Sequence, residues 1–140
     1  MRKNLLFAIL LLLLFASCDY YKNYRLDGMW QLKTVQDSNG NESKVDTVYY
    51  SFQREVVFSF TVLESPQFAM YPVYGYMDMP SGNQVHILIN NISDDDFIGR
   101  FLSLSGWSAA DITFDIKSYS NRNLILFDKG NGKTYTLIKF

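Results

Sequence analysis

The sequence contains a single cysteine, Cys18, and a single histidine, His86, among its 140 residues. One cysteine cannot form a disulfide within the chain, so a folded domain must be held together by its core alone. A zinc site takes three or four histidine, cysteine or acidic ligands, and a catalytic histidine needs a nucleophile and an orienting acid beside it. The scarcity of both residue types therefore argues against a zinc site and against histidine catalysis.

Sequence motifs of common enzyme classes are missing as well. The chain has no Gly-x-x-x-x-Gly-Lys loop, no Gly-x-Ser-x-Gly turn and no Gly-x-Gly-x-x-Gly fingerprint. The acidic run 94–96 lacks the alternating spacing of aspartates that a calcium-binding loop requires. We therefore predict that the protein is not an enzyme and that it carries neither a metal nor another cofactor.

Charge of one sign forms no long run in the chain, and the longest run is the three aspartates 94–96. The 13 lysines and arginines are matched by 14 aspartates and glutamates, and neither group clusters enough to suggest binding of nucleic acid. Aromatic residues are plentiful, with 11 phenylalanines, 10 tyrosines and two tryptophans. Such large side chains fill a core well, and the length of the chain suits one domain.

The amino-terminal segment has the pattern of an export signal. Arg2 and Lys3 precede an apolar run from residue 5 to residue 15, and Ala16 and Ser17 supply small residues after it. The run is too short to cross a bilayer, which takes about 20 apolar residues in a helix. We predict that residues 1–17 are a signal peptide that is removed.

Cys18 follows this segment directly, and Phe15-Ala16-Ser17-Cys18 resembles the bacterial lipobox, with phenylalanine at the usual leucine position. The resemblance implies that the Cys18 thiol is alkylated with diacylglycerol and that this residue becomes the new amino terminus. Two or more acyl chains, such as palmitate, would hold the protein at a membrane essentially permanently. Residues 18–26 would then be a lipidated tether. The alternative is that Cys18 is a free thiol of a plain secreted domain.

From residue 27 onward, β-branched and aromatic residues alternate with polar ones between clusters of turn residues. The residues at 80–83 read as a hairpin loop. His86 is expected to face the solvent or the lumen from its strand. The pattern predicts strands over residues 28–36, 45–53, 55–63, 73–79, 84–90, 112–117, 124–127 and 134–140.

Residues 94–104 break the alternating pattern. Ser93 stands in the position of an N-cap before three aspartates, whose charge suits the first turn of a helix. Gly106 would end such a helix. We predict a short helix over these residues, with a strand over 101–104 as the alternative. Apolar side chains recur here at helical spacing, at Phe97, Phe101 and Leu104.

About eight antiparallel strands joined by short turns favour a barrel or a sandwich. The stretch Asp27-Gly28-Met29-Trp30-Gln31-Leu32 resembles the Gly-x-Trp opening strand of lipocalins. With the lipobox and the carboxy-terminal strand, the mature chain resembles the small lipocalin-like, calycin-type lipoproteins of Bacteroidetes. This resemblance implies an all-β, up-and-down barrel over residues 27–140, closed at one end by Trp30. It also implies a lipid anchor at the outer membrane of a Gram-negative bacterium.

The most unusual local composition lies at residues 70–79. Tyr74 and Tyr76 share one face of the predicted strand, whereas Met77 and Met79 share the other. Either face is suited to line a pocket, because tyrosine offers a flat face with a polar tip and methionine adapts to irregular apolar ligands. These four residues are the candidate ligand contacts. The alternative is ordinary packing, since a barrel of about eight strands is just wide enough for its own side chains.

Two functions follow from these expectations. The first is a non-catalytic lipocalin-like lipoprotein of the cell envelope that binds a small apolar or amphiphilic ligand. The second is a structural or protein-interaction module with a filled barrel core, whose partner is another envelope protein. A third class, a hydrolase or an inhibitor, is disfavoured by the single histidine.

Overall fold

A computed structural model of the chain describes residues 24–54, 56–63, 73–90 and 93–140. The predicted signal peptide and the lipid-attachment residue Cys18 lie outside these ranges. Within the described ranges, no helix has the length and apolar character needed to cross a membrane.

The described chain is dominated by antiparallel strands, with one α-helix and one short 3-10 helix. The strands are β1 (Gly28–Gln36), β2 (Glu42–Lys44), β3 (Val48–Gln53), β4 (Val57–Val62), β5 (Val73–Ser81), β6 (Gln84–Ile89), β7 (Asp111–Tyr119), β8 (Asn123–Asp128) and β9 (Lys133–Lys139). The helices are η2 (Tyr24–Leu26) and α2 (Asp95–Ser105).

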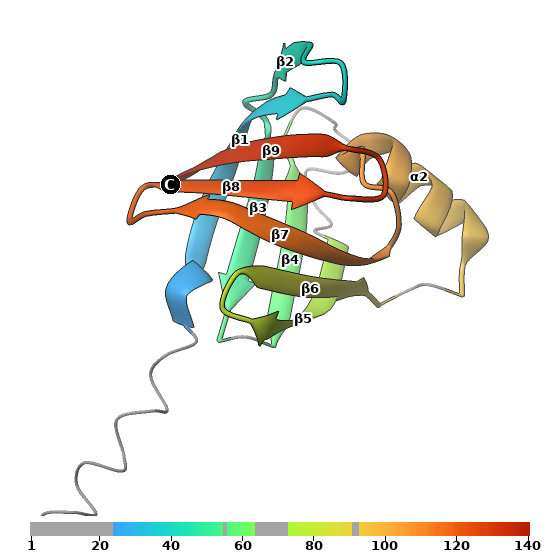
Figure 1. The fold of residues 1–140 in the computed structure, drawn as a ribbon. Helices are drawn as coiled ribbons and strands as arrows, with labels where there is room; N and C mark the ends of the chain where they lie inside the picture. Colours follow the sequence, from blue (N-terminus) through green and yellow to red (C-terminus); the bar gives the residue numbers. More distant parts are fainter. Residues whose placement is uncertain (1–23, 55, 64–72, 91–92) are drawn as a thin grey trace, which may run out of the picture.

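The sheet closes on itself into a barrel (Figure 1). Neighbouring strands pair in chain order from β3 to β9, and β1 pairs with both β3 and β9. The short strand β2 pairs only with the end of β1, so it extends the sheet beyond the eight strands of the barrel. This architecture confirms the predicted all-β, up-and-down barrel with one helix.

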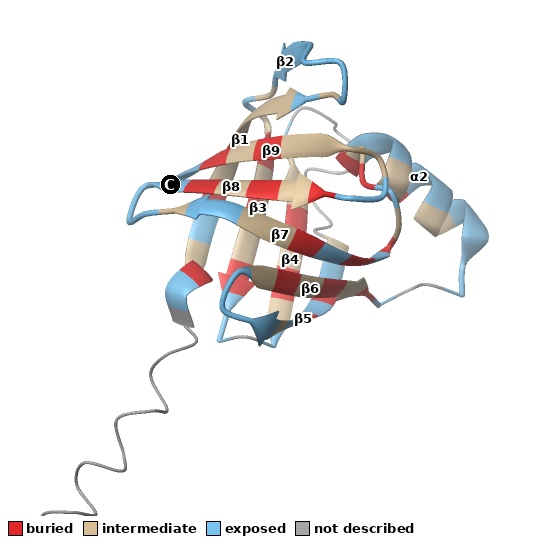
Figure 2. Ribbon diagram, viewed as in Figure 1, coloured by how far each residue is buried: buried red, intermediate tan, exposed pale blue. Residues whose placement is uncertain are grey.

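Buried residues alternate with more exposed ones along the strands, as the colours of Figure 2 show. In β3, for example, Val48, Tyr50 and Phe52 are buried while Tyr49 and Ser51 are only half-buried. This alternation follows from the two-residue repeat of a strand. It explains why the apolar and polar residues of the sequence alternate in the same register.

The two helices lie at opposite ends of the barrel (Figure 1). The 3-10 helix η2 directly precedes β1, at the end where β9 finishes. Helix α2 follows β6 and leads into β7, at the end where β4 finishes and β5 begins. The barrel therefore has an η2 end and an α2 end.

Three local features differ from the sequence prediction. The strand predicted to start at residue 45 begins at Val48, and β2 was not predicted. All three residues of β2 are exposed, so this strand has no apolar alternation to reveal it. Strand β5 continues through Pro80 to Ser81, with a register shift between Asp78 and Ser81. A bulge tolerates proline because the ladder is already interrupted there.

The predicted helix is present, and its boundaries move by one residue. Its N-cap is Asp94 rather than Ser93, because the Asp94 carboxylate accepts a hydrogen bond from the Phe97 N–H at 3.0 Å. Gly106 ends the helix in the left-handed conformation, with φ of 69°, as a C-cap glycine does. The alternative strand over residues 101–104 is excluded.

Candidate ligand-binding site

Aromatic side chains fill the interior of the barrel. Trp107 lies at their centre, with ring centroids 5.0 Å from Phe114, 5.4 Å from Phe58 and 5.7 Å from Tyr50. Its Nε1–H donates a hydrogen bond of 2.8 Å to the Tyr50 hydroxyl. Burial raises the pKa of that hydroxyl well above its ordinary value, so Tyr50 stays neutral. Among the described residues, the interior thus has the character of a packed core.

The η2 end is sealed around Trp30, which is fully buried. Its Nε1–H donates a hydrogen bond of 2.7 Å to the carbonyl of Leu26, which is itself buried. The Lys139 ammonium lies 5.1 Å from the centre of the Trp30 ring and donates to the Asp27 carbonyl at 2.7 Å. The sequence prediction placed Trp30 at a closed end, and the structure places it here, under η2.

Gly28 explains the glycine of the Gly-x-Trp motif. Its φ is 120°, a conformation that other residues rarely adopt. A Cβ atom at this position would also lie 2.8 Å from the Lys139 side chain. Glycine therefore lets β1 begin close to the end of β9 while Trp30 enters the core.

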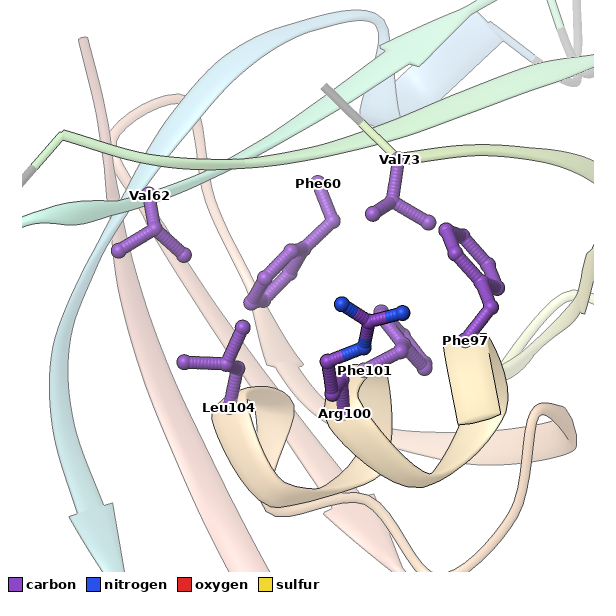
Figure 3. Close-up of a pocket in the computed structure, with 7 residues that line it drawn as sticks. All are labelled: Phe60, Val62, Val73, Phe97, Arg100, Phe101 and Leu104. Atoms are coloured by element: carbon purple, nitrogen blue, oxygen red, sulfur yellow. The ribbon is translucent and has the colours of Figure 1, made fainter. Parts of the chain in front are cut away.

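An apolar pocket of about 130 Å³ lies at the α2 end. It opens between α2 and the facing strands, with the end of β4 and the start of β5 on one side and the helix on the other (Figure 3). Phe60 and Phe101 form its floor, and their rings meet edge to face at 5.3 Å. Its lining residues are Phe60, Val62, Val73, Phe97, Arg100, Phe101 and Leu104.

Helix α2 supplies more than half of this lining because of its periodicity. Phe97, Arg100, Phe101 and Leu104 are spaced three or four residues apart, so they share one face of the helix. Phe101 is buried against Phe60 and Trp107, whereas Leu104 keeps 40% of its surface exposed. The middle of the helix therefore contacts the core through Phe101, and a gap remains between the helix and the strands beside this contact.

The carboxy-terminal end of α2 is tied to the barrel by hydrogen bonds. The Gly106 carbonyl accepts one from the Tyr135 hydroxyl at 2.7 Å and another from Asn131 Nδ2 at 2.8 Å. Farther along, the buried Asp128 carboxylate accepts from the Ser108 N–H at 2.8 Å and from its hydroxyl at 2.7 Å. These bonds hold the helix in one position over the barrel.

Arg100 is the one charged side chain among the described residues of the pocket. Its Nε–H donates a hydrogen bond of 3.3 Å to the Asp96 carbonyl in the preceding turn. Figure 3 shows its two terminal nitrogens directed toward the middle of the ring of lining residues. A positive group thus stands at the edge of an otherwise apolar surface.

The four candidate ligand contacts on β5 lie elsewhere. Tyr74 and Tyr76 point outward and keep 53% and 59% of their surface exposed. Met77 is part of the core, and Met79 packs against it. None of the four is among the described residues that line the pocket, although Val73 on the same strand is. Ligand contact at these four residues stays a prediction.

His86 lies on the outer wall of the barrel between two carboxylates. Its Nδ1 is 2.6 Å from Asp78 on β5, and its Nε2 is 2.7 Å from Asp111 on β7. The hydrogen bond with Asp111, assisted by Asp78, raises the pKa of the imidazole above its ordinary value. Both ring nitrogens are occupied, so the arrangement is a cross-strand ion cluster.

A second hollow, of about 550 Å³, lies near the η2 end and is wide and shallow. Met29, Arg54 and Val56 contribute to its lining. Because it is so open, it would remove little of a ligand's surface from water. The described part of the chain also contains no cluster of three or more histidine, cysteine or acidic side chains that could hold a metal ion.

The sequence predicted the strands and the helix that carry the apolar residues of the pocket, but not the pocket itself. Phe60 and Val62 belong to the alternating face of β4, and Phe97, Phe101 and Leu104 to the apolar face of the helix. Arg100 was missed. Its position three residues after Phe97 and four before Leu104 was the available signal, since it placed a charge on the apolar face.

Comparisons with known proteins agree with this fold. The family model described as a lipocalin-like domain matches residues 12–140. A lipocalin-like protein from Bacteroides uniformis ATCC 8492 has a similar crystal structure, with a TM-score of 0.69 and 28% sequence identity. The match covers 83% of this chain and 99% of that chain. A search of the curated proteins found no match.

A second solved structure shows the fold alone, because its sequence is more distant. It is an uncharacterized protein from Bacteroides eggerthii DSM 20697, with a TM-score of 0.68 and 20% identity. The match covers 82% of this chain and 99% of that chain. The closed eight-stranded barrel with its helix thus defines the class as lipocalin-like. Since the family model spans nearly the whole sequence, the chain belongs to the lipocalin-like domain family.

Proposed function

We propose that this chain is a non-catalytic, lipid-anchored protein of the cell envelope that binds a small apolar or amphiphilic ligand between α2 and the barrel. The observation that carries this proposal is the apolar pocket of about 130 Å³. Apolar cavities of about 150 Å³ stay dry and accept a molecule the size of benzene. The buried part of the ligand would therefore be about six carbon atoms in size.

The packed interior makes the α2 end a better place for a ligand than the barrel lumen. Trp107 and its aromatic neighbours occupy the volume that a ligand inside the barrel would need. By contrast, Leu104 and Phe97 are partly exposed and can be covered further by a ligand. Removing such apolar surface from water stabilises a complex by about 25 cal/mol per Å².

Substitution of Leu104 by tryptophan tests the pocket. The larger side chain would fill the gap between α2 and β4, so we expect Leu104→Trp to weaken binding of octan-1-ol by about tenfold or more. The measurement is isothermal titration of the full chain carrying Cys18→Ser, so that no acyl group on the chain competes. Ser103→Trp, on an exposed position of the same helix, is the matched control. Equal binding by both variants, or no binding by the parent chain, would contradict the proposal.

The lipid anchor is tested separately at Cys18. We expect the unmodified sequence to fractionate with membranes and Cys18→Ser to be released, because the substitution removes the thiol that would carry the acyl chains. Ser17→Ala is the control, since it keeps a small residue before the cysteine. The measurement is cell fractionation with mass spectrometry of the amino-terminal peptide. An unmodified sequence whose amino-terminal peptide carries no acyl chain on Cys18 contradicts the anchor.

A second candidate function is a structural or protein-interaction module, and the filled aromatic core favours it. The exposed side chain of Phe140, which packs edge to face on Tyr49, offers an apolar surface to such a partner. Native mass spectrometry of the protein purified from its own host separates the two candidates. A bound small molecule supports the first, and its absence supports the second.

A further inference from the structure

The charge of Arg100 indicates which chemical group a ligand of the α2 pocket would carry. The other described lining residues are apolar, so the guanidinium is the one group there that selects between charged and neutral ligands. A guanidinium pairs with the two oxygens of a planar acid through parallel hydrogen bonds, which are stronger than those between neutral groups. An ammonium group would be repelled at the same position.

The geometry allows such a pair without burying an ion. The hydrogen bond from Arg100 Nε to the Asp96 carbonyl uses an edge of the guanidinium and leaves its terminal nitrogens directed toward the pocket (Figure 3). Arg100 itself is exposed, so an acid bound to it would stay in contact with water. The large desolvation cost of a buried ion pair is therefore avoided.

We propose that the ligand is an aliphatic carboxylate, with its head on Arg100 and its tail in the apolar space between Phe60, Phe101 and Leu104. This inference rests on the function proposed above and adds the acid head to it. The pocket volume limits the buried tail to about six carbons, so an eight-carbon acid would span from the guanidinium to the floor.

Three probes with the same tail test the inference: octanoate, octan-1-ol and octylammonium. Each is titrated at pH 7 and low salt into the full chain carrying Cys18→Ser. We expect octanoate to bind about tenfold more tightly than octan-1-ol, and octylammonium to bind most weakly. In Arg100→Gln, octanoate should lose about tenfold in affinity, while octan-1-ol should change by less than about twofold.

Arg122→Gln is the matched control, because Arg122 is an exposed arginine in the turn between β7 and β8, at the η2 end. It should leave the affinity for all three probes unchanged. Loss of octanoate binding in this variant would show that net charge rather than position matters, and would overturn the inference.

The outcomes separate the inference from the proposed function. If octan-1-ol binds but octanoate binds no more tightly, or if Arg100→Gln has no effect, the acid head is wrong and the apolar pocket stands. Octyl phosphate is titrated as a fourth ligand with the same tail, and if it binds more tightly than octanoate, the assignment to a carboxylate is overturned. If none of the probes binds, both the inference and the proposed function are wrong.

Discussion

The two ends of the barrel are closed by different interactions. At the η2 end, Trp30 is fully buried and its polar atom is bonded to the Leu26 carbonyl, while Lys139 covers the ring. At the α2 end, the apolar face of one helix lies over the barrel, and a gap of about 130 Å³ remains beside Phe101. At the η2 end, one aromatic side chain whose hydrogen bond is satisfied fills its space. At the α2 end, a straight helix cannot follow the curved rim of the barrel, so a gap remains.

We therefore expect the two ends to contribute to different properties, the η2 end to the stability of the fold and the α2 end to the proposed binding of a ligand. Around Trp30 the η2 end is tightly packed, and the second hollow near that end is too open to remove much of a ligand's surface from water. Leu104, at the α2 end, keeps 40% of its surface exposed, so a ligand of the proposed kind would lower the free energy of the complex by covering it, without displacing core side chains. Substitutions at the two ends should therefore affect different measurements.

The largest effect is expected at Trp30. Replacing it with alanine removes a buried aromatic side chain and should lower the free energy of unfolding by about 3–5 kcal/mol. Trp30→Phe should cost less, because it retains much of the ring but loses the hydrogen bond to Leu26, a contribution of about 1 kcal/mol. Urea denaturation followed by circular dichroism measures both. Leu104→Ala, at the other end, should cost about 1 kcal/mol or less, since this side chain is partly exposed already.

If Leu104→Ala destabilised the protein as much as Trp30→Ala, the contrast between the two ends would be wrong. The same would hold if Trp30→Ala left the unfolding midpoint unchanged.

A smaller effect is expected at the start of α2. Asp94→Ala removes the acceptor of the Phe97 N–H and should destabilise the protein by about 1 kcal/mol, the usual cost of losing an N-cap. Asp95→Ala, one residue later, removes a similar charge without removing the cap. It should therefore cost only about a few tenths of a kcal/mol, which is the contribution of a surface charge interacting with the helix dipole. Thermal unfolding of both variants is the measurement. If both variants lost the same amount of stability, the effect would come from the negative charge and not from the N-cap hydrogen bond, and the prediction would be wrong.

The smallest effect concerns His86, on the wall between the two ends. Its pKa is raised in the folded protein by Asp111 and Asp78, so its contribution to stability is present in full below the ordinary pKa of about 6.5. That contribution is lost as the pH rises through the folded-state pKa. Because the cluster is partly exposed, we expect less than about 1 kcal/mol.

The measurement is urea denaturation of the parent chain and of His86→Gln from pH 5 to pH 9. The difference in unfolding free energy between them should shrink as the pH rises. A difference that grows with pH would contradict the assignment of a protonated histidine between two carboxylates.

The regular parts of the fold were predictable because their side chains carry a period. The alternation of Phe58 and Phe60 on β4, or of Ile112 and Phe114 on β7, marks strands that bury one face. The helical spacing of Phe97 and Phe101 marks α2 in the same way. Strand β2 has no buried residue, so its sequence has no alternation of apolar and polar residues that would predict its pairing with β1.

Single contacts, whether local or between distant segments, could not be predicted from these periods. The N-cap is a clear example, since Ser93 and Asp94 are both suitable caps and only the backbone geometry selects Asp94. Asp128 is another, because an aspartate at the end of a strand is ordinarily solvated. Here it is buried beside Ser108, which lies 20 residues earlier.

The sequence by itself determined most of the strands and the helix, because burial of one face demands a local period that can be read along the chain. That period left a barrel and a sandwich open, and the closed barrel was predicted from the resemblance to lipocalins. It also supplied the basis for predicting export and lipid attachment at Cys18. The tertiary structure alone decided that the lumen is filled by Trp107 and its aromatic neighbours, and that a pocket with Arg100 at its edge remains under α2. Whether space is filled depends on how side chains from separate elements meet, and a one-dimensional pattern does not record that.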